Sequence, residues 1–370
     1  MLLDATLKHL AALVAFDTRN PPRAIGTDGI FDYLRAQLPG FDFTLADHGA
    51  GAVSLYARRG NPKLLFNVHL DTVPDSPAWT RDPHVLAVDA DHATGLGACD
   101  IKGAAAGLLS AANTTTGDMA MLFTTDEEAN DPRCVTAFLA ACEAGTLPKP
   151  EAVIVAEPTR SKAVLAHRGI QSVLMKFAGH VGHASAKQKP GDSALHQAVR
   201  WGNAALDYVE SQAAVKFGGL RGLRFNIGRI EGGIKANMIA PAAELRFNMR
   251  PLPSMDPDAL LATFRGFASE VAPAHFEETF RGPSLPAGPA ERTEARRIQA
   301  EMLAEELGIT VGAAVDFWTE AALFSAAGYP AFVFGPGDIA QAHAADEWVD
   351  LAQLQQHAET IQGIVSRGLA

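Results

Sequence analysis

Phe66-Asn-Val-His-Leu-Asp71 has the alternating pattern of a β-strand, and it places two polar side chains together. Successive side chains of a strand point to opposite faces, so Phe66 and Val68 share one face while His69 and Asp71 share the other. One imidazole and one carboxylate therefore lie side by side at the end of an apolar strand. A single pair of this kind is common by chance, so its meaning depends on where the other acids and histidines occur.

Length and composition bound the class of protein. A chain of 370 residues is too long for one ordinary core and suits two domains. The net charge of −11 argues against nucleic acid or an anionic membrane surface as a partner. Three cysteines without a C-x-x-C pair indicate reduced thiols, the N-terminus shows no signal-peptide core, and no apolar run approaches membrane-spanning length. We therefore expect a soluble cytoplasmic protein.

Apolar periodicity and turn residues predict an α/β domain around this strand. Buried strands are expected at 52–57, 64–70, 119–124, 152–156 and 331–334. The first two of these strands are expected to pair through the turn between them. Helices are expected at 4–16, 28–38, 101–112, 293–307, 320–326 and 351–365.

The pattern changes at Gly169, where a second domain is expected to begin. Its strands are predicted at 172–177, 223–230, 243–249 and 275–280, and its helices at 193–210 and 256–271. The order βαββαβ is that of the split-βαβ, ferredoxin-like sandwich. We therefore predict one α/β domain over 1–168 and 283–370, interrupted by an inserted domain over 169–282.

Candidate metal ligands follow four separate apolar strands. Ligands of an open α/β sheet bind at the carboxyl ends of its strands, so side chains at those ends are expected to meet. Two histidines with several carboxylates suit a hydrolytic Zn²⁺ site, with Co²⁺ or Mn²⁺ as substitutes, and a cation relieves the repulsion among the acids. The candidates are His69, Asp71, Glu127, Glu128, Glu157 and His343, with Asp100 at the start of the helix between the first two strands.

Motifs along the chain point to one family. They are His69-Leu-Asp-Thr-Val73, Gly97-Ala-Cys-Asp-Ile-Lys-Gly103, Thr125-Asp-Glu-Glu128, Ala156-Glu-Pro-Thr159, Gly179-His-Val-Gly-His-Ala-Ser185, Gly232-Gly-Ile-Lys-Ala-Asn237, Asn248-Met-Arg-Pro-Leu-Pro253 and His343-Ala-Ala-Asp-Glu347. In this order they resemble the metal-dependent aminoacylase/carboxypeptidase family, which includes acetylornithine deacetylase and succinyl-diaminopimelate desuccinylase. Ala166-His-Arg-Gly169 and Thr319-Glu-Ala321 look most like the acetylornithine deacetylase branch.

The resemblance implies a mixed-sheet α/β metallohydrolase that holds one or two Zn²⁺ or Co²⁺ ions. His69 and Glu157 would hold one ion and Glu128 with His343 the other, while Asp100 bridges the two. Asp71 would fix the ring of His69, as carboxylates behind metal-bound histidines do. Glu127 would be the general base that accepts a proton from the attacking water and passes it to the departing amine.

The inserted domain would then be a lid and dimerisation domain of a homodimer. His183 resembles the residue that reaches into the partner subunit's site and stabilises the oxyanion, although it could be a surface histidine. Asn237 and Arg250 resemble residues that grip the substrate, and an arginine fork suits an α-carboxylate. Arg250 could also be an ordinary charge at a strand end.

The implied substrate is a small acetylated amino acid of arginine biosynthesis, N-acetyl-L-citrulline or N-acetyl-L-ornithine. The positive charges of Arg133, Lys187 and Lys189, in segments that depart from the family pattern, would discourage an ornithine cation and favour acetylcitrulline. Alternatives in the same family are a dipeptidase or carboxypeptidase and a succinyl-diaminopimelate desuccinylase. A non-enzymatic metal-binding protein is a further alternative, which the presence of Glu127 argues against.

Overall fold

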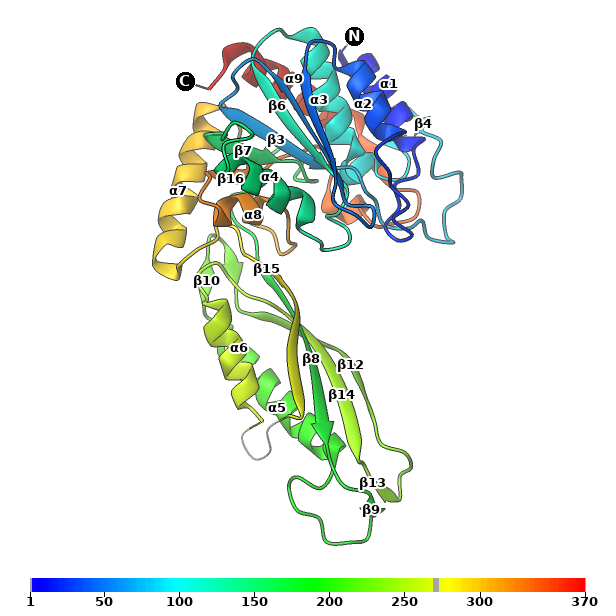
Figure 1. Cartoon of the computed structure of the whole chain (residues 1–370), viewed down its shortest axis with the longest axis vertical. Coiled ribbons are helices and arrows are strands. Elements are labelled where there is room, and N and C mark those ends of the chain that lie inside the picture. The colour runs from blue at the N-terminus through cyan, green and yellow to red at the C-terminus, as the bar shows by residue number, and fades with distance from the viewer. Residues whose placement is uncertain (1, 269–272, 370) are drawn as a thin grey trace. The chain divides into compact units, whose positions relative to one another are not determined.

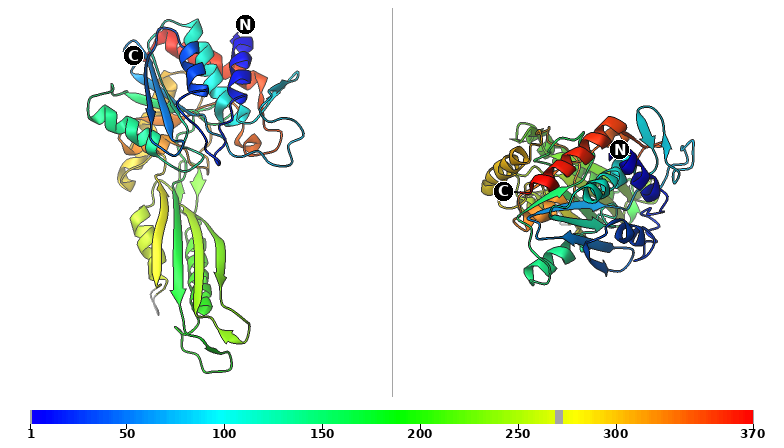
Figure 2. Two further views of the ribbon diagram at one scale, coloured as in Figure 1. Left: turned by 45° about the vertical axis from the view of Figure 1, so that its right-hand side comes forward. Right: turned by 90° about the horizontal axis from the view of Figure 1, so that it is seen from above.

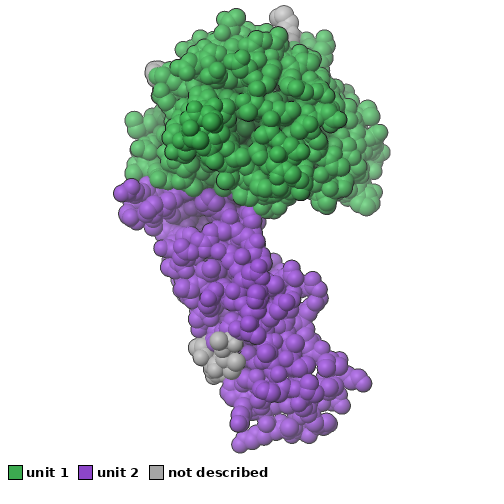
Figure 3. All heavy atoms as spheres, in the orientation of Figure 1, with its two compact units in different colours: residues 1–165, 295–313, 319–370 green, residues 166–294, 314–318 purple. Residues whose placement is uncertain are grey.

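The computed structural model describes residues 2–268 and 273–369, which fall into two compact units. Unit 1 comprises Met1–Leu165, Ala295–Ala313 and Thr319–Ala370, and unit 2 comprises Ala166–Glu294 and Ala314–Trp318 (Figure 3). No helix among the described residues is long and apolar enough to cross a membrane.

Unit 1 is built on a six-stranded mixed sheet with the order β1-β2-β6-β3-β7-β16 (Figure 1). The central strands β6, β3, β7 and β16 run parallel, whereas β2 is antiparallel to both β6 and β1. The strands are β1 (Asp42–Asp47), β2 (Val53–Arg59), β3 (Leu64–His69), β6 (Met119–Thr124), β7 (Ala152–Val155) and β16 (Ala331–Val333). The structure thus confirms the predicted mixed-sheet α/β class.

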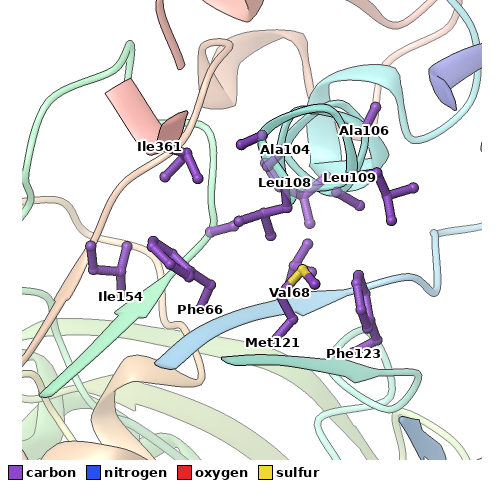
Figure 4. Packing of buried hydrophobic residues seen from close by; sticks show 14 of the residues in the cluster. Phe66, Val68, Ala104, Ala106, Leu108, Leu109, Met121, Phe123, Ile154 and Ile361 are labelled. Atoms are coloured by element: carbon purple, nitrogen blue, oxygen red, sulfur yellow. The ribbon is translucent and has the colours of Figure 1, made fainter. Parts of the chain in front are cut away.

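Helices cover both faces of this sheet, so its central strands are buried along their whole length. Strands β3 and β6 are buried at every position, which is typical of parallel strands between two helical layers. On one face, α3 lies over Phe66 and Val68 of β3 and Met121 of β6 (Figure 4). On the other face, Phe138 of α4 packs against Phe324 of α8 with ring centroids 6.3 Å apart.

Six of the unit-1 helices agree with the predicted ones to within a few residues, whereas α4 was not predicted. Helices α1, α3 and α9 pack on one another, and Figure 2 shows the C-terminal α9 (red) lying beside α3 in the view from above. The helices are α1 (Leu2–Val14), α2 (Ile30–Gln37), α3 (Gly103–Thr114), α4 (Arg133–Glu143), α7 (Ala290–Glu306), α8 (Ala321–Ala326) and α9 (Leu351–Arg367).

The predicted pairing of the 52–57 strand with the 64–70 strand is wrong. Strand β6 lies between β2 and β3, with Leu55 opposite Phe123 on one side and Phe66 opposite Met121 on the other. The right-handed crossover through α3 brings β6 parallel to β3, and β2 then pairs with the free edge of β6. The edge strand β1 was not predicted, because its half-exposed residues give only a weak apolar signal.

Unit 2 contains a four-stranded antiparallel sheet with the order β12-β14-β8-β15. Its elements are β8 (Ile170–Ala178), α5 (Ala194–Ser211), β12 (Arg224–Gly232), β14 (Ala242–Arg250), α6 (Pro257–Gly266) and β15 (His275–Gly282), in the predicted βαββαβ sequence. Trp201 of α5, Phe264 of α6 and Phe247 of β14 form the centre of its core, so both helices pack on one face. The predicted second helix extended to 271, and its residues 269–271 lie outside the described part.

The boundaries of unit 2 differ from the predicted 169–282. Residues 283–294 and 314–318 also cluster with this unit. The Trp318 indole N–H donates to the Pro283 carbonyl at 2.9 Å, and the buried Arg168 guanidinium donates to Asp316 Oδ1 at 2.5 Å. These two hydrogen bonds lie in irregular segments, where the periodicity of strands and helices gives no signal.

Short strands complete the described structure. A three-stranded sheet in unit 1 joins β4 (Ala87–Val88), β5 (His92–Thr94) and β17 (Trp348–Asp350), and places the segment before β17 near residues 95–100. Unit 2 carries two further small pairs. They are β9 (Gly182–His183) with β13 (Met238–Ile239), and β10 (Lys216–Phe217) with β11 (Leu220–Arg221).

Candidate active site

The ends of three parallel strands place acids and a histidine at one edge of the unit-1 sheet. Strand β3 ends at His69, which pairs with Thr124 at the end of β6. Glu127 and Glu128 follow β6 within a few residues, and Glu157 follows β7 in the same way. The structure therefore gathers these side chains at the carboxyl edge, where α/β sheets bind ligands.

Two groups of side chains at this edge have the spacing of metal ligands. Nε2 of His69 lies 3.2 Å from Oδ1 of Asp100 and 3.9 Å from Oε1 of Glu157. Nε2 of His343 lies 3.4 Å from Oδ2 of the same Asp100 and 3.1 Å from Oε1 of Glu128. In each group the candidate ligand atoms all lie within 4.8 Å of one another. The two groups share Asp100, one carboxylate oxygen facing each histidine.

Asp71 lies behind His69 and fixes the orientation of its ring. Nδ1 of His69 lies 3.0 Å from the backbone carbonyl of Asp71 and 3.5 Å from its Oδ1. Oδ2 of Asp71 accepts hydrogen bonds from the Asn20 amide at 2.9 Å and from the Glu128 backbone N–H at 3.1 Å. Because the acceptors face Nδ1, the proton of a neutral ring sits there and Nε2 is left as the free lone pair. Sequence reasoning gave Asn20 no role.

Asp100 lies in an irregular turn rather than at the start of a helix. Helix α3 begins at Gly103, and Asp100 sits in the preceding π-helical segment with non-helical backbone angles of φ −122° and ψ 85°. Its expected position at the N-terminal edge of a helix over 101–112 is therefore wrong, because two residues separate it from α3. Gly97 opens the turn with φ 78°, and a Cβ there would lie 2.7 Å from Thr72. The turn, not a helix N-terminus, presents the Asp100 carboxylate to both histidines.

Burial and mutual repulsion shape the charges of the site. Burial, reinforced by the charges of Glu128 and Asp100, raises the pKa of Glu127 well above its usual value. Burial and the Asp100 charge do the same to the pKa of Glu157. Hydrogen bonds that the His343 ring donates to the Asp100 and Glu128 carboxylates raise the pKa of His343 to about 10. These directions describe buried carboxylates that lie close enough to disfavour one another's charge.

Glu320 is a buried carboxylate beneath the site that the sequence pattern did not single out. Its Oε2 accepts hydrogen bonds from the Asn67 amide at 2.5 Å and from the Thr124 hydroxyl at 3.0 Å. Burial, together with the charge of Asp126, raises the pKa of Glu320 to about 8. The side chain thus links β3 and β6 just before the residues that carry the site. Its only sequence signal was membership of the Thr319-Glu-Ala321 motif.

The three predicted unit-2 residues lie at two different ends of that unit. His183 is exposed, with Nδ1 2.7 Å from the Ser185 hydroxyl. The β9–β13 pair places it next to the segment of Asn237, whose carbonyl accepts from the Ala184 N–H at 3.0 Å. Arg250 ends β14 and is half-buried, with its Nε donating to Asn248 Oδ1 at 3.1 Å. Figure 1 shows β9 and β13 at one end of unit 2, beyond the start of β14.

Arg133 is held by an ion pair rather than free. The guanidinium contacts Asp131 at distances down to 2.5 Å and also donates to the His48 carbonyl at 2.8 Å. Asp131 pairs in addition with Arg23 at 3.0 Å, so one carboxylate serves two guanidinium groups. The expected effect of Arg133 on an ornithine side chain stays a prediction.

The donor set fits a pair of divalent cations. It offers two imidazole nitrogens and three carboxylates, which are the ligands that Zn²⁺ and related ions take in hydrolytic sites. Cations between these groups would offset the repulsion that raises the carboxylate pKa values. An α/β sheet with such a set at its carboxyl edge defines the class of metal-dependent hydrolases.

Comparison with known proteins identifies the family. Residues 65–367 match peptidase family M20/M25/M40. The chain therefore belongs to this family, as the sequence motifs predicted. Solved structures agree at the level of the fold. An aminopeptidase PepT from Bacillus cereus superposes with a TM-score of 0.71 at 18% identity, covering 98% of both chains. A protein from Bacillus subtilis described as a dinuclear metal binding peptidase of the M20 family superposes with a TM-score of 0.66 at 15% identity, over 100% of this chain and 98% of that one.

Two curated relatives are deacetylases. The chain is 68% identical over 366 residues to the N-acetyl-L-citrulline deacetylase of Xanthomonas campestris, covering 99% of this chain and 98% of that protein. It is 30% identical over 325 residues to the acetylornithine deacetylase of Pectobacterium atrosepticum, covering 84% of this chain and 82% of that protein. Identity to the first is more than twice that to the second and extends over nearly the whole chain.

Proposed function

We propose that this protein is a metal-dependent amidohydrolase that removes the acetyl group from an N-α-acetylated amino acid of arginine biosynthesis, with N-acetyl-L-citrulline as its substrate. The observation that carries the reaction is the pair of ligand groups that share Asp100, with Glu127 adjacent to one of their members. The 68% identity to an N-acetyl-L-citrulline deacetylase supports the choice of substrate. A cytoplasmic location forms part of the proposal, in keeping with three buried free thiols.

The residues of the two groups are assigned as metal ligands. His69 and Glu157 hold one ion, Glu128 and His343 hold the other, and Asp100 contributes one oxygen to each. The geometry of the shared carboxylate supports this division, because its two oxygens face different histidines. Bound Zn²⁺ or Co²⁺ supplies Lewis-acid polarisation of the amide carbonyl and of the attacking water.

Glu127 is assigned as the general base. Its carboxylate accepts a proton from water while the water oxygen bonds to the amide carbonyl carbon. The same proton then passes to the amide nitrogen as the carbon–nitrogen bond breaks, which gives acetate and the free amino acid. Burial raises the pKa of this carboxyl toward the working pH, which suits a group that must both take and return a proton.

Arg250 and the pair His183 and Asn237 are assigned to the substrate, but they act from different subunits. Strand β14 runs from Ala242 to Arg250, and its eight residue steps span about 26 Å at roughly 3.3 Å per residue. His183 and Asn237 lie beyond the Ala242 end. One small substrate cannot touch both ends of the same chain. A homodimer in which the partner supplies one set resolves this separation.

The edge of unit 2 offers a surface for such a homodimer. Strand β12 is an edge strand of its sheet, and Ile230 on it is 46% exposed. Helix α5, which packs on β12, exposes Val199 and Leu206, and their spacing of seven residues puts them on one face. Exposed apolar side chains beside an unpaired strand edge favour association with a second copy.

A substrate panel tests the proposed function. At fixed metal and pH, kcat/KM is measured for N-acetyl-L-citrulline, N-acetyl-L-ornithine, succinyl-diaminopimelate and a dipeptide. We expect acetylcitrulline to be preferred, because a site that pairs with a neutral ureido group rejects a cation of similar size. A preference for acetylornithine would contradict the substrate assignment, and a preference for the dipeptide would contradict deacetylation itself.

A further inference from the structure

We propose that Glu347 is a positioning residue that ties the segment of His343 to the turn of Asp100, and so sets the second ligand group. This inference rests on the proposed metal centre and adds a residue to which no role has been assigned. Glu347 is buried, with 2% of its surface exposed. Within the described part of the chain, its carboxylate hydrogen-bonds to backbone N–H groups and not to a candidate ligand atom of either group. Its effect is therefore exerted through the backbone of the turn.

The carboxylate of Glu347 accepts three backbone hydrogen bonds from one turn. Its Oε1 accepts from the N–H groups of Cys99 at 2.8 Å and of Asp100 at 2.9 Å. Its Oε2 accepts from the N–H of Gly97 at 3.2 Å. Buried backbone N–H groups require an acceptor, and this one carboxyl group supplies it for all three. The three groups lie just before α3, where the first N–H groups of a helical segment have no partner within the helix.

Glu347 belongs to the same short segment as His343, four residues earlier. His343 has a φ of 59°, which is uncommon for a residue with a side chain and requires support from its surroundings. The Glu347 side chain thus fixes the distance between the turn of Asp100 and the segment of His343. These two segments come from different parts of the chain and reach the same metal position. The other partner of that position, Glu128, is held separately through its N–H to Asp71.

The two ligand groups depend to different extents on the hydrogen bonds between Glu347 and the turn of Asp100. The first group takes His69 from the end of β3 and Glu157 from just after β7, and only Asp100 from the turn. The second group takes both Asp100 and His343 from the elements that Glu347 joins. Loss of the Glu347 carboxylate should therefore weaken the second ion more than the first.

The main chain around Glu347 has its own anchors, so a side-chain variant should stay folded. The Glu347 carbonyl accepts from the Gly95 N–H at 2.9 Å, and β17 directly after it pairs with β5. Glu347→Gln keeps the shape but replaces one oxygen by an N–H₂ group that cannot accept a hydrogen bond. Glu347→Ala removes all three acceptor contacts and serves as the second variant.

Stepwise cobalt binding tests the proposal. The full chain is stripped with a chelator and titrated with Co²⁺, while the visible absorption of the bound ion and competition with a chromophoric chelator report each step. We expect two steps in the wild type. The step that disappears in His343→Ala reports the second group. In Glu347→Gln this step should lose about 10–100-fold in affinity, the range seen for partners behind metal ligands, and the other step should change less. Glu347→Ala should show the same order of effects, more strongly.

Asp350→Ala is the matched control. Asp350 lies three residues beyond Glu347, and its carboxylate caps α9 by accepting from the Gln353 N–H at 2.8 Å. Its loss should lower the melting temperature but leave the hydrogen bonds to the turn of Asp100 unchanged. Both of its cobalt steps should match the wild type. Unchanged cobalt steps in both Glu347 variants overturn the proposal, as does an equal loss in the Asp350 control. A wild-type chain that binds no Co²⁺ overturns instead the metal centre on which the proposal rests.

Discussion

Oδ1 of Asp100 lies 3.2 Å from Nε2 of His69, and the other oxygen of the same carboxylate faces a second histidine. One side chain therefore belongs to both ligand groups, and neither group is complete without it. The residues that hold the ions are thus coupled, whereas the residues that move protons or bind substrate can be changed one at a time. The predictions below use that separation.

Glu127→Gln should keep the metal content and lose turnover. The amide cannot accept a proton from water, and general base catalysis contributes about 10²–10⁴-fold to the rate. Metal analysis and steady-state kinetics on a single preparation check this. Glu128→Gln is the control, because it should lose metal from the group that contains His343. A near-normal kcat in Glu127→Gln would show that the base has been misassigned.

Glu320→Gln should reduce the loss of stability between acid and neutral pH. Burial and the Asp126 charge raise the pKa of Glu320 from 4.5 to about 8 in the folded state. Because the folded pKa is the higher one, the group stabilises the protein below about pH 4.5 and this contribution disappears as the pH rises toward 8. Glutamine retains an acceptor for the Asn67 amide and does not titrate. Urea unfolding at pH 5 and pH 8 measures the free energy of unfolding of the wild type and the variant. An equal change of this free energy between the two pH values in both proteins would contradict the prediction.

Mixed dimers should recover activity that neither parent has. Glu127→Ala and His183→Ala should each be nearly inactive, because each lacks one part of every site. A dimer of one chain of each type contains one site with an intact Glu127 and the partner's intact His183. Co-refolding the two variants and measuring deacetylation tests this. Mixing Glu127→Ala with the double variant is the control, since no intact site can form. If verified mixed dimers show no recovery of activity, His183 acts in the site of its own chain or has no part in catalysis.

Arg250→Ala should raise KM for an acetylated amino acid by about 10–100-fold. Hydrogen bonds to a charged group contribute about 1.5–3 kcal/mol, and the variant would lose the bidentate hydrogen bonds from the guanidinium to the α-carboxylate. Arg250→Lys should restore little, because an ammonium cannot bind a carboxylate bidentately. Arg246→Ala is the control, since this arginine lies on the same strand, is exposed and pairs with Glu244. Equal KM values for the variants at 250 and 246 would make Arg250 an ordinary strand-end charge.

Local patterns were enough to predict most elements and the positions of the candidate ligands. Every candidate ligand lies just after a short apolar strand or within a motif. Parallel strands bring their carboxyl ends to one edge of the sheet, whichever strands are neighbours. His69, Glu128 and Glu157 could therefore be expected to meet even though the order of the strands was partly wrong. The insertion of β6 between β2 and β3 is a long-range choice, which periodicity within each strand does not encode.

The supporting residues could not be predicted in the same way. Asn20 and Glu347 lie far along the chain from the residues they contact, and each acts through hydrogen bonds to a single partner segment. Glu320 stands in a motif, but its burial beneath β3 and β6 is a property of the packed sheet. The ion pairs of Asp131 with Arg133 and Arg23 likewise depend on side-chain geometry, which charge counted along the sequence does not reveal.

The position of unit 2 in the chain has an evolutionary consequence. Strands β7 and β16 are parallel neighbours in the unit-1 sheet, and the chain runs through unit 2 on its way from one to the other. Parallel neighbours need a long crossover in any case, and each doubling of a loop adds only about 0.6 kcal/mol of closure cost. A whole domain can thus be acquired, lost or exchanged at this point without shifting the register of the sheet. Unit 1, with the carboxyl edge of its sheet, and unit 2 are therefore free to diverge at different rates.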